Sequence, residues 1–134
     1  PVCGKPVTVG VLNRVAELAD RAEGFCPPNA VPYVNMVPLD EIIAEARGVG
    51  SATGKGVQEE YLSVVKEFGT EFAVLFDAPR ADLESRLRPE VAEGIMRVRE
   101  GRLHITPGFD GQYGTVKIFE EGKMGRLSKQ ASLF

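Results

Sequence analysis

Apolar residues recur at helical spacing near the start of the chain. Between residues 9 and 23 they form one stripe, opposite charged residues. The stripe consists of Val11, Leu12, Val15, Leu18, Ala19 and Ala22. Thr8 is a suitable N-cap and Gly24 a suitable stop, so the pattern predicts an amphipathic helix over residues 9–23.

The next segment, residues 25–33, contains three prolines in nine positions. Proline fixes φ and lacks a backbone donor, so neither a helix nor a central strand is expected there. Because Phe25, Val31 and Tyr33 are interspersed, we expect an ordered, extended connector that packs on a neighbouring element. A flexible linker would be more polar.

Further helices are expected at four places in the middle of the chain. Apolar stripes followed by glycine predict helices over residues 38–47 and 56–68. A short helix is expected from 77–79 to about residue 87, and another from Pro89 to Gly101. Residues 70–77 form an apolar run that fits either a buried strand or a short buried helix.

Two β-rich segments, residues 103–106 and 115–119, flank the glycine-rich residues 107–114 and predict a β-hairpin with a wide loop. We therefore expect an α+β, mainly helical fold: a helical domain with a C-terminal hairpin over residues 9–119. Residues 120–134 are polar and glycine-punctuated, which predicts a mobile tail. The expected core comprises Leu12, Val15, Leu18, Ile42, Ile43, Tyr61, Val65, Phe72, Leu75, Ile95 and Ile118.

Composition limits the possible classes of protein. With 134 residues, 43% hydrophobic and 26% charged, the chain fits one globular domain or a fragment. Its longest apolar run, residues 72–76, is far shorter than the roughly 20 residues of a membrane span, and no signal peptide is recognisable. We expect a soluble, cytoplasmic protein. The net charge of −3 opposes a basic surface over the whole molecule, so any nucleic-acid contact must be local.

Cysteine and histidine are scarce. Cys3, Cys26 and His104 supply neither a disulfide framework nor a complete zinc site, which excludes a His-rich metallohydrolase. The chain starts at Pro1, and Cys3-Gly4-Lys5 looks like the second half of a C-x-x-C zinc pair. We therefore read the sequence as a fragment, with a lone terminal thiol as the alternative.

The glycine-rich residues 48–56 look like a phosphate-binding loop. The Walker pattern G-x-x-x-x-G-K-[ST] fails, however, because it needs glycine at Val49 and serine or threonine at Gly56, and it should follow a strand. An interhelical loop is the better interpretation. Amides at the helix start near Gly56, together with Lys55, could still contact a DNA phosphate.

Residues 80–102 are rich in arginine, which suits bidentate phosphate contacts. Interrupting acids allow the alternative that most of these arginines form ion pairs on solvated helix faces. If the arginines gather on one face, we expect phosphate contacts from Arg97, Arg99 and Arg102, with Lys117 nearby. His104 has no nucleophile partner nearby in the sequence and is expected to be a packed or surface histidine.

The chain ends in Gln130-Ala131-Ser132-Leu133-Phe134, which looks like the Q-x-S-L-F peptides that dock bacterial sliding clamps. Leu133 and Phe134 would enter an apolar pocket, and Gln130 would hydrogen-bond at its rim. Ala131 departs from the pattern, because a larger aliphatic residue is usual there. The alternative is a hydrophobic C-terminus that folds back on the domain.

Several segments carry a family resemblance: residues 3–12, 19–21, 24–33, 38–46, 68–75, 91–95, 97–101 and 107–114. They resemble the C-terminal part of endonuclease Q-like proteins, which are PHP-domain DNA repair nucleases. Some of these relatives carry a helicase-related, UvrD-like label.

The resemblance implies a multidomain hydrolase that cleaves DNA beside deaminated or abasic lesions. It would have divalent metals in an N-terminal PHP domain and then a zinc module, of which residues 1–8 are the remnant. Cys3 matches the second cysteine of one C-x-x-C pair, whereas Cys26 falls at a non-ligand position. The catalytic histidines and acids of the PHP site have no counterpart here, so no catalytic residue is assigned.

We therefore expect a non-catalytic region that positions DNA and binds a partner. The alternatives are a module that tethers the protein to the sliding clamp and a helicase-related or nucleotide-binding piece. The expected site residues are Lys55, Arg97, Arg99, Arg102 and Lys117 for DNA, Gln130, Leu133 and Phe134 for the clamp, and Cys3 for zinc.

Overall fold

The computed structural model describes residue 4 and residues 9–109 and 111–120. The chain forms two compact units, residues 1–34 and residues 35–134. Among the described residues, none of the helices is both long and apolar enough to cross a membrane.

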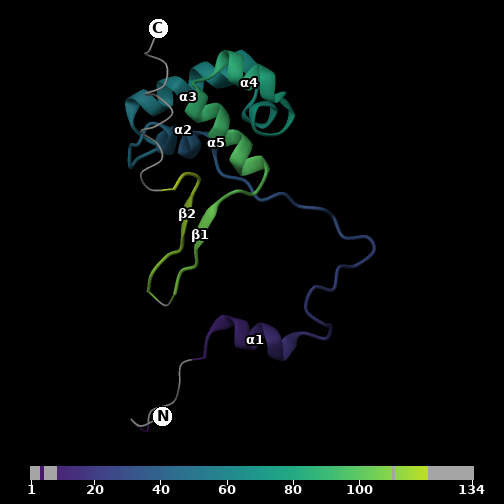
Figure 1. Ribbon diagram of the computed structural model, residues 1–134. Helices are drawn as coiled ribbons and strands as arrows, with labels where there is room; N and C mark the ends of the chain where they lie inside the picture. Colours follow the sequence, from purple (N-terminus) through teal and green to yellow (C-terminus); the bar gives the residue numbers. More distant parts are fainter. Residues whose placement is uncertain (1–3, 5–8, 110, 121–134) are drawn as a thin grey trace. The chain divides into compact units, whose positions relative to one another are not determined.

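In the first unit, α1 spans Val11–Leu18 and is shorter than predicted (Figure 1). The prediction that Leu12, Val15 and Leu18 are buried is wrong, since these side chains are 56–83% exposed. A one-sided apolar stripe needs a second element to cover it. The described part of residues 1–34 contains no other helix or strand.

Residues 25–33 form no helix or strand, as predicted. Their apolar side chains do not pack as expected, however: Phe25, Val31 and Tyr33 are all exposed. The guanidinium of Arg21 lies 5.0 Å from the centre of the Phe25 ring. Three prolines therefore set the backbone course without supplying a core for these side chains.

Four α-helices form most of the described part of the second unit. They are α2 (Leu39–Ala46), α3 (Lys55–Phe68), α4 (Arg80–Arg86) and α5 (Pro89–Arg99). All four lie within about two residues of their predicted limits. Gly48 and Gly69 follow α2 and α3 with φ of 68° and 92°, conformations that glycine adopts without strain.

The apolar run at 70–77 is helical, so the helix alternative is confirmed and the strand alternative is wrong. Residues Ala73–Asp77 form η1, a short π-helix. Val74 and Leu75 are buried, but Phe72 is exposed, contrary to prediction. Helical spacing puts Phe72 and Phe76 on one outer face, where their rings stack 5.7 Å apart.

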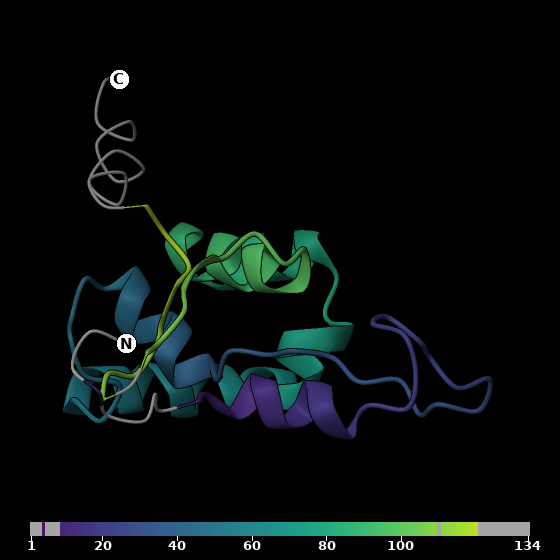
Figure 2. The ribbon, with the colours of Figure 1, turned by 90° about the horizontal axis from the view of Figure 1, so that it is seen from below.

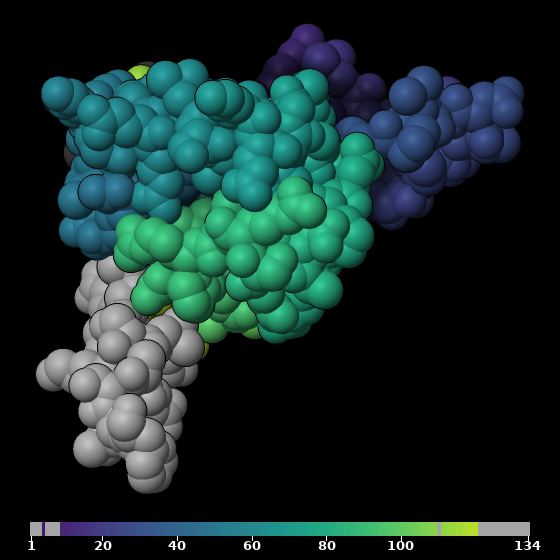
Figure 3. Space-filling model, turned by 90° about the horizontal axis from the view of Figure 1, so that it is seen from above, coloured from purple at the N-terminus to yellow at the C-terminus, as the bar shows by residue number. Residues whose placement is uncertain are grey.

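The core lies between α2 and α5, with α3, η1 and α4 packed around them (Figure 2). In the space-filling view, the helices drawn in teal and green form one continuous surface (Figure 3). Gly94 lets α5 approach α2 closely, because a Cβ at position 94 would lie only 2.8 Å from Cγ2 of Ile42. Of the expected core, Tyr61 and Val65 are only partly buried. The largest fully buried side chains are Leu39, Ile42, Ile43, Val74, Leu83, Val91, Ile95 and Ile118.

The predicted hairpin is present. Strands β1 (His104–Thr106) and β2 (Thr115–Lys117) pair antiparallel, with Ile105 opposite Val116. All six strand residues are exposed, and the hairpin extends away from the helices of its unit (Figure 1). The α+β, mainly helical fold class is therefore confirmed.

Candidate nucleic-acid interface

Arg97 lies at the junction between α5 and the end of the hairpin. Its Nε donates to Glu93 Oε1 at 2.9 Å, and its Nη1 donates to the carbonyl of Ile118 at 3.2 Å. The guanidinium also lies 5.2 Å from the centre of the Phe119 ring, within the range of a cation–π contact. Arg97 thus joins α5 to the chain that follows β2.

Arg102 shares the carboxylate of Glu93 with Arg97. Its Nη1 lies 3.4 Å from Glu93 Oε1, and its Nε pairs with Glu100. Burial raises the pKa of Glu93, but the hydrogen bond from Arg97 and the charges of Arg102 and Arg97 outweigh burial, and the pKa is lowered overall. The hydrogen bond with Glu100 raises the pKa of Arg102. The structure brings Arg97 and Arg102 together, but in an ion-pair cluster.

Arg99 points elsewhere. Its Nε, Nη1 and Nη2 donate to the carbonyls of Leu75, Ala78 and Val74, each at 2.7 Å. Burial lowers the pKa of Arg99, although the charge of Asp77 opposes this shift. The guanidinium caps the last turn of η1 and ties it to α5. Its predicted contact with DNA remains a prediction.

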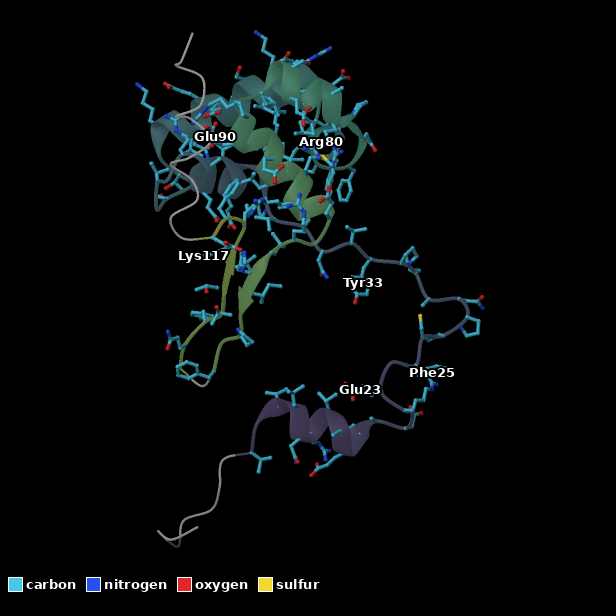
Figure 4. The ribbon with its side chains drawn as sticks, viewed as in Figure 1. Glu23, Phe25, Tyr33, Arg80, Glu90 and Lys117 are labelled. Atoms are coloured by element: carbon cyan, nitrogen blue, oxygen red, sulfur yellow. The ribbon has the colours of Figure 1, made fainter. Side chains whose placement is uncertain are left out.

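Lys117 lies on β2, near the end of the hairpin that joins the helices (Figure 4). Its partner in the strand register is His104, whose Nε2 lies 3.7 Å from Glu120. A lysine and a histidine therefore share one face of the ribbon, because cross-strand partners point to the same side.

Lys55 starts α3, and 90% of its side chain is accessible, compared with 23% for Arg97 and 47% for Arg102. Its Nζ lies 3.9 Å from Glu59, a weak surface pair. The glycine loop before it follows α2, a helix, so the strand required by a Walker loop is absent at this place.

An open cleft of about 640 Å³ separates this loop from β2. Val49, Gly50 and Ala52 line one side, and Thr115–Lys117 line the other. Glu41 and Glu45 of α2 are also in the lining. The glycine loop and the strand that carries Lys117 therefore border the same hollow.

Sequence reasoning missed two features of this region. Glu45 was not singled out, yet its Oε1 accepts hydrogen bonds from the backbone N–H groups of Ile118 and Phe119. The aromatic residues of the hairpin loop, Phe109 and Tyr113, were also not assigned a role, although both are largely exposed. Aromatic residues between closely spaced glycines were the available signal for the second feature.

Four predicted site residues lie outside the described residues: Cys3, Gln130, Leu133 and Phe134. Within the described part of the chain, no group of three or more His, Cys, Asp or Glu side chains could hold a metal ion. Cys3 as a zinc ligand, and the upstream zinc module that the family resemblance implies, therefore remain predictions.

Comparison with known sequences gives two relatives of this chain. It is 39% identical over 118 residues to the uncharacterized protein MJ0043 of Methanocaldococcus jannaschii, and 36% identical over 116 residues to the uncharacterized protein YqxK of Bacillus subtilis. These alignments cover 88% and 86% of this chain, but only 15% and 27% of the relatives. The chain thus matches a small part of each longer protein.

Two solved structures are similar to this chain. The lesion-specific endonuclease PfuEndoQ from Pyrococcus furiosus matches with a TM-score of 0.71 and 36% identity, over 100% of this chain and 32% of that protein. An endonuclease Q in complex with a 27-mer duplex substrate carrying an abasic lesion matches with a TM-score of 0.70 and 40% identity, over 90% of this chain and 30% of that protein.

A family model also matches the helical part of the chain. Residues 38–102, which contain α2 to α5 and η1, match the MJ0043 C-terminal domain. The helical part of the chain therefore matches the MJ0043 C-terminal domain, and the resemblance of the chain to the C-terminal region of endonuclease Q-like proteins is confirmed.

Proposed function

We propose that this chain is the DNA-positioning region of an endonuclease Q-like repair nuclease that acts beside deaminated or abasic lesions. The observation that carries the proposal is the similarity, at 40% identity and a TM-score of 0.70, to an endonuclease Q in complex with a lesion-bearing duplex. The chain spans about a third of that protein, so catalysis is assigned to the remainder.

The charge distribution specifies how the chain would hold DNA. Because the net charge is −3, attraction to phosphate must be local. Lys117 lies on β2 and lines the open cleft, Lys55 follows the glycine loop that lines its other side, and both lysines are exposed. Arg102 is half exposed, so a phosphate could compete with Glu100 for its guanidinium. These three residues are the proposed phosphate contacts, and Arg97 would orient the hairpin beside them.

The test is fluorescence anisotropy of labelled duplexes, one intact and one with a deaminated base, at several salt concentrations. Salt-sensitive binding is expected. Lys55→Ala, Arg102→Ala and Lys117→Ala should each reduce the slope of log K against log salt by about one. Lys66→Ala removes the same charge from an exposed site on α3 and should leave the slope unchanged. Failure of the wild-type chain to bind at low salt would refute the proposal.

A second candidate function is tethering to a sliding clamp, which the sequence of Gln130-Ala131-Ser132-Leu133-Phe134 favours. Deletion of these five residues should abolish binding to an immobilised clamp. Substitution of Ala131 by leucine should strengthen it, because a larger aliphatic residue would fill the pocket. Retained binding by the deletion variant would exclude the peptide as the tether.

A further inference from the structure

The hairpin presents its largest apolar side chains to solvent. Tyr113 is 95% exposed and Phe109 is 70% exposed, and both lie in the loop between β1 and β2. A two-stranded ribbon has too little buried surface to hold such rings in a core. The exposure of two aromatic rings at one tip therefore calls for a partner.

Backbone hydrogen bonds nevertheless hold the tip in a defined turn. The backbone N–H of Phe109 donates to the carbonyl of Gln112 at 3.0 Å, and that of Gln112 donates to the carbonyl of Phe109 at 2.8 Å. Gly111 lies inside this turn with φ of 81°, a conformation that suits glycine. These two reciprocal hydrogen bonds fix the backbone position of Phe109 in the loop.

Two further glycines bring the two sides of the loop together. A Cβ on Gly108 would lie 2.5 Å from the backbone nitrogen of Gly114, and a Cβ on Gly114 would lie 2.8 Å from the nitrogen of Gly108. No side chain fits at either place. The close approach narrows the ribbon next to Tyr113 and limits the freedom of the tip, so less ordering is needed on binding.

The other end of the hairpin is anchored. Glu45 accepts from the N–H groups of Ile118 and Phe119, and Arg97 donates to the carbonyl of Ile118. Ile118 and Phe119 are buried, whereas every strand residue is exposed. The ribbon is thus held at its base by α2 and α5, while its tip projects from the helices of the unit (Figure 1).

The chemistry of the ribbon suits DNA. His104 and Lys117 pair across the strands, as do Thr106 and Thr115, so one face is polar and carries one lysine. The other face carries a single apolar pair, Ile105 and Val116. A ribbon of this kind lacks the wide apolar face that a protein partner would cover, but a two-stranded ribbon fits a DNA groove and aromatic rings stack on bases.

We propose that the hairpin is a base-contacting wedge: its tip enters duplex DNA at an unstacked position, where Tyr113 and Phe109 stack on the neighbouring bases. This inference rests on the proposed function. An abasic site leaves a gap in the base stack, so an inserted ring replaces lost stacking at a lower cost than in an intact duplex. The wedge would therefore favour damaged over intact DNA.

The test compares two labelled duplexes that differ only in one central abasic analogue, with 2-aminopurine beside it. Tyr113→Ala and Phe109→Ala should each weaken binding to the abasic duplex by at least about fivefold and remove the change in 2-aminopurine fluorescence. Tyr113→Phe keeps the ring and should retain both. Tyr33→Ala truncates a tyrosine of similar exposure in the first unit and should behave as wild type.

The outcomes separate this inference from the function on which it rests. If both alanine variants bind and perturb the abasic duplex as wild type does, the wedge is excluded while DNA binding stands. If the wild-type chain binds neither duplex in a salt-sensitive way, the proposed function itself fails. Circular dichroism should show unchanged helix content in every variant, since the substituted rings contribute nothing to the core.

Discussion

Oε1 of Glu45 accepts a 2.8 Å hydrogen bond from the backbone N–H of Ile118, 73 residues further along the chain. The same oxygen accepts from the N–H of Phe119, also at 2.8 Å. One carboxylate on α2 thus satisfies two consecutive amides at the point where the hairpin returns to the helices. Two backbone donors near the core would otherwise lack a partner.

We predict that Glu45→Ala lowers the free energy of unfolding by about 2–4 kcal/mol, because two charge-assisted hydrogen bonds are lost and two amides lose their acceptor. Urea denaturation measures the loss, and hydrogen exchange at Ile118 and Phe119 should accelerate. Glu41→Ala, one turn earlier on the same helix and exposed, is the matched control and should change stability by less than about 0.5 kcal/mol. Equal unfolding midpoints for the two variants would contradict the anchor.

A second prediction concerns acid. The pKa of Glu93 is lowered from its ordinary value of 4.5: burial opposes ionisation, but Arg97 and Arg102 outweigh it. A carboxylate with a lowered folded-state pKa stabilises the fold above its unfolded pKa, and this stabilisation is lost as pH falls through the folded value. The chain should therefore lose stability between about pH 5 and the acid limit.

Urea midpoints measured from pH 7 down to pH 3 would test the role of this carboxylate. Glu93→Gln should be less stable than wild type at pH 7, and the gap should close on acidification, because the wild-type side chain becomes neutral too. Glu84→Gln, at an exposed partner of Arg80, should follow the wild-type curve closely. A gap between wild type and Glu93→Gln that stays constant with pH would contradict the assignment.

Local signals explain what could be predicted from sequence. Glycine after α2 and α3 and proline at the start of α5 mark helix ends through backbone chemistry that acts within a few residues. The apolar stripe of α1 gave the right element but the wrong burial, because periodicity reveals a face and not what covers it. The predicted burial of Phe72 was wrong for a related reason, because an apolar run does not show which of its side chains point outward.

Local signals could not predict the hydrogen-bond partners of Arg99 and Glu45. The acceptors for Arg99 are backbone carbonyls 21 to 25 residues away, and Glu45 binds amides more than 70 residues away. Every residue has a carbonyl and nearly every residue an amide, so nothing in the sequence marks these particular partners. The arginine-rich stretch therefore could not separate Arg99, which caps η1, from Arg102 at the surface.

This separation gives the third prediction. Arg99→Ala should lower the free energy of unfolding by about 3–5 kcal/mol, because three hydrogen bonds to the carbonyls around η1 are lost. Arg99→Lys should recover only part of the loss, since an ammonium cannot reach all three carbonyls as the planar guanidinium does. Arg102→Ala should have the opposite profile: nearly unchanged stability, with weaker and less salt-dependent DNA binding.

Thermal melting and fluorescence anisotropy on the same three variants distinguish the role of Arg99 from that of Arg102. If Arg99→Ala melted like wild type but bound DNA poorly, Arg99 would be a phosphate contact, and the cap on η1 would be dispensable.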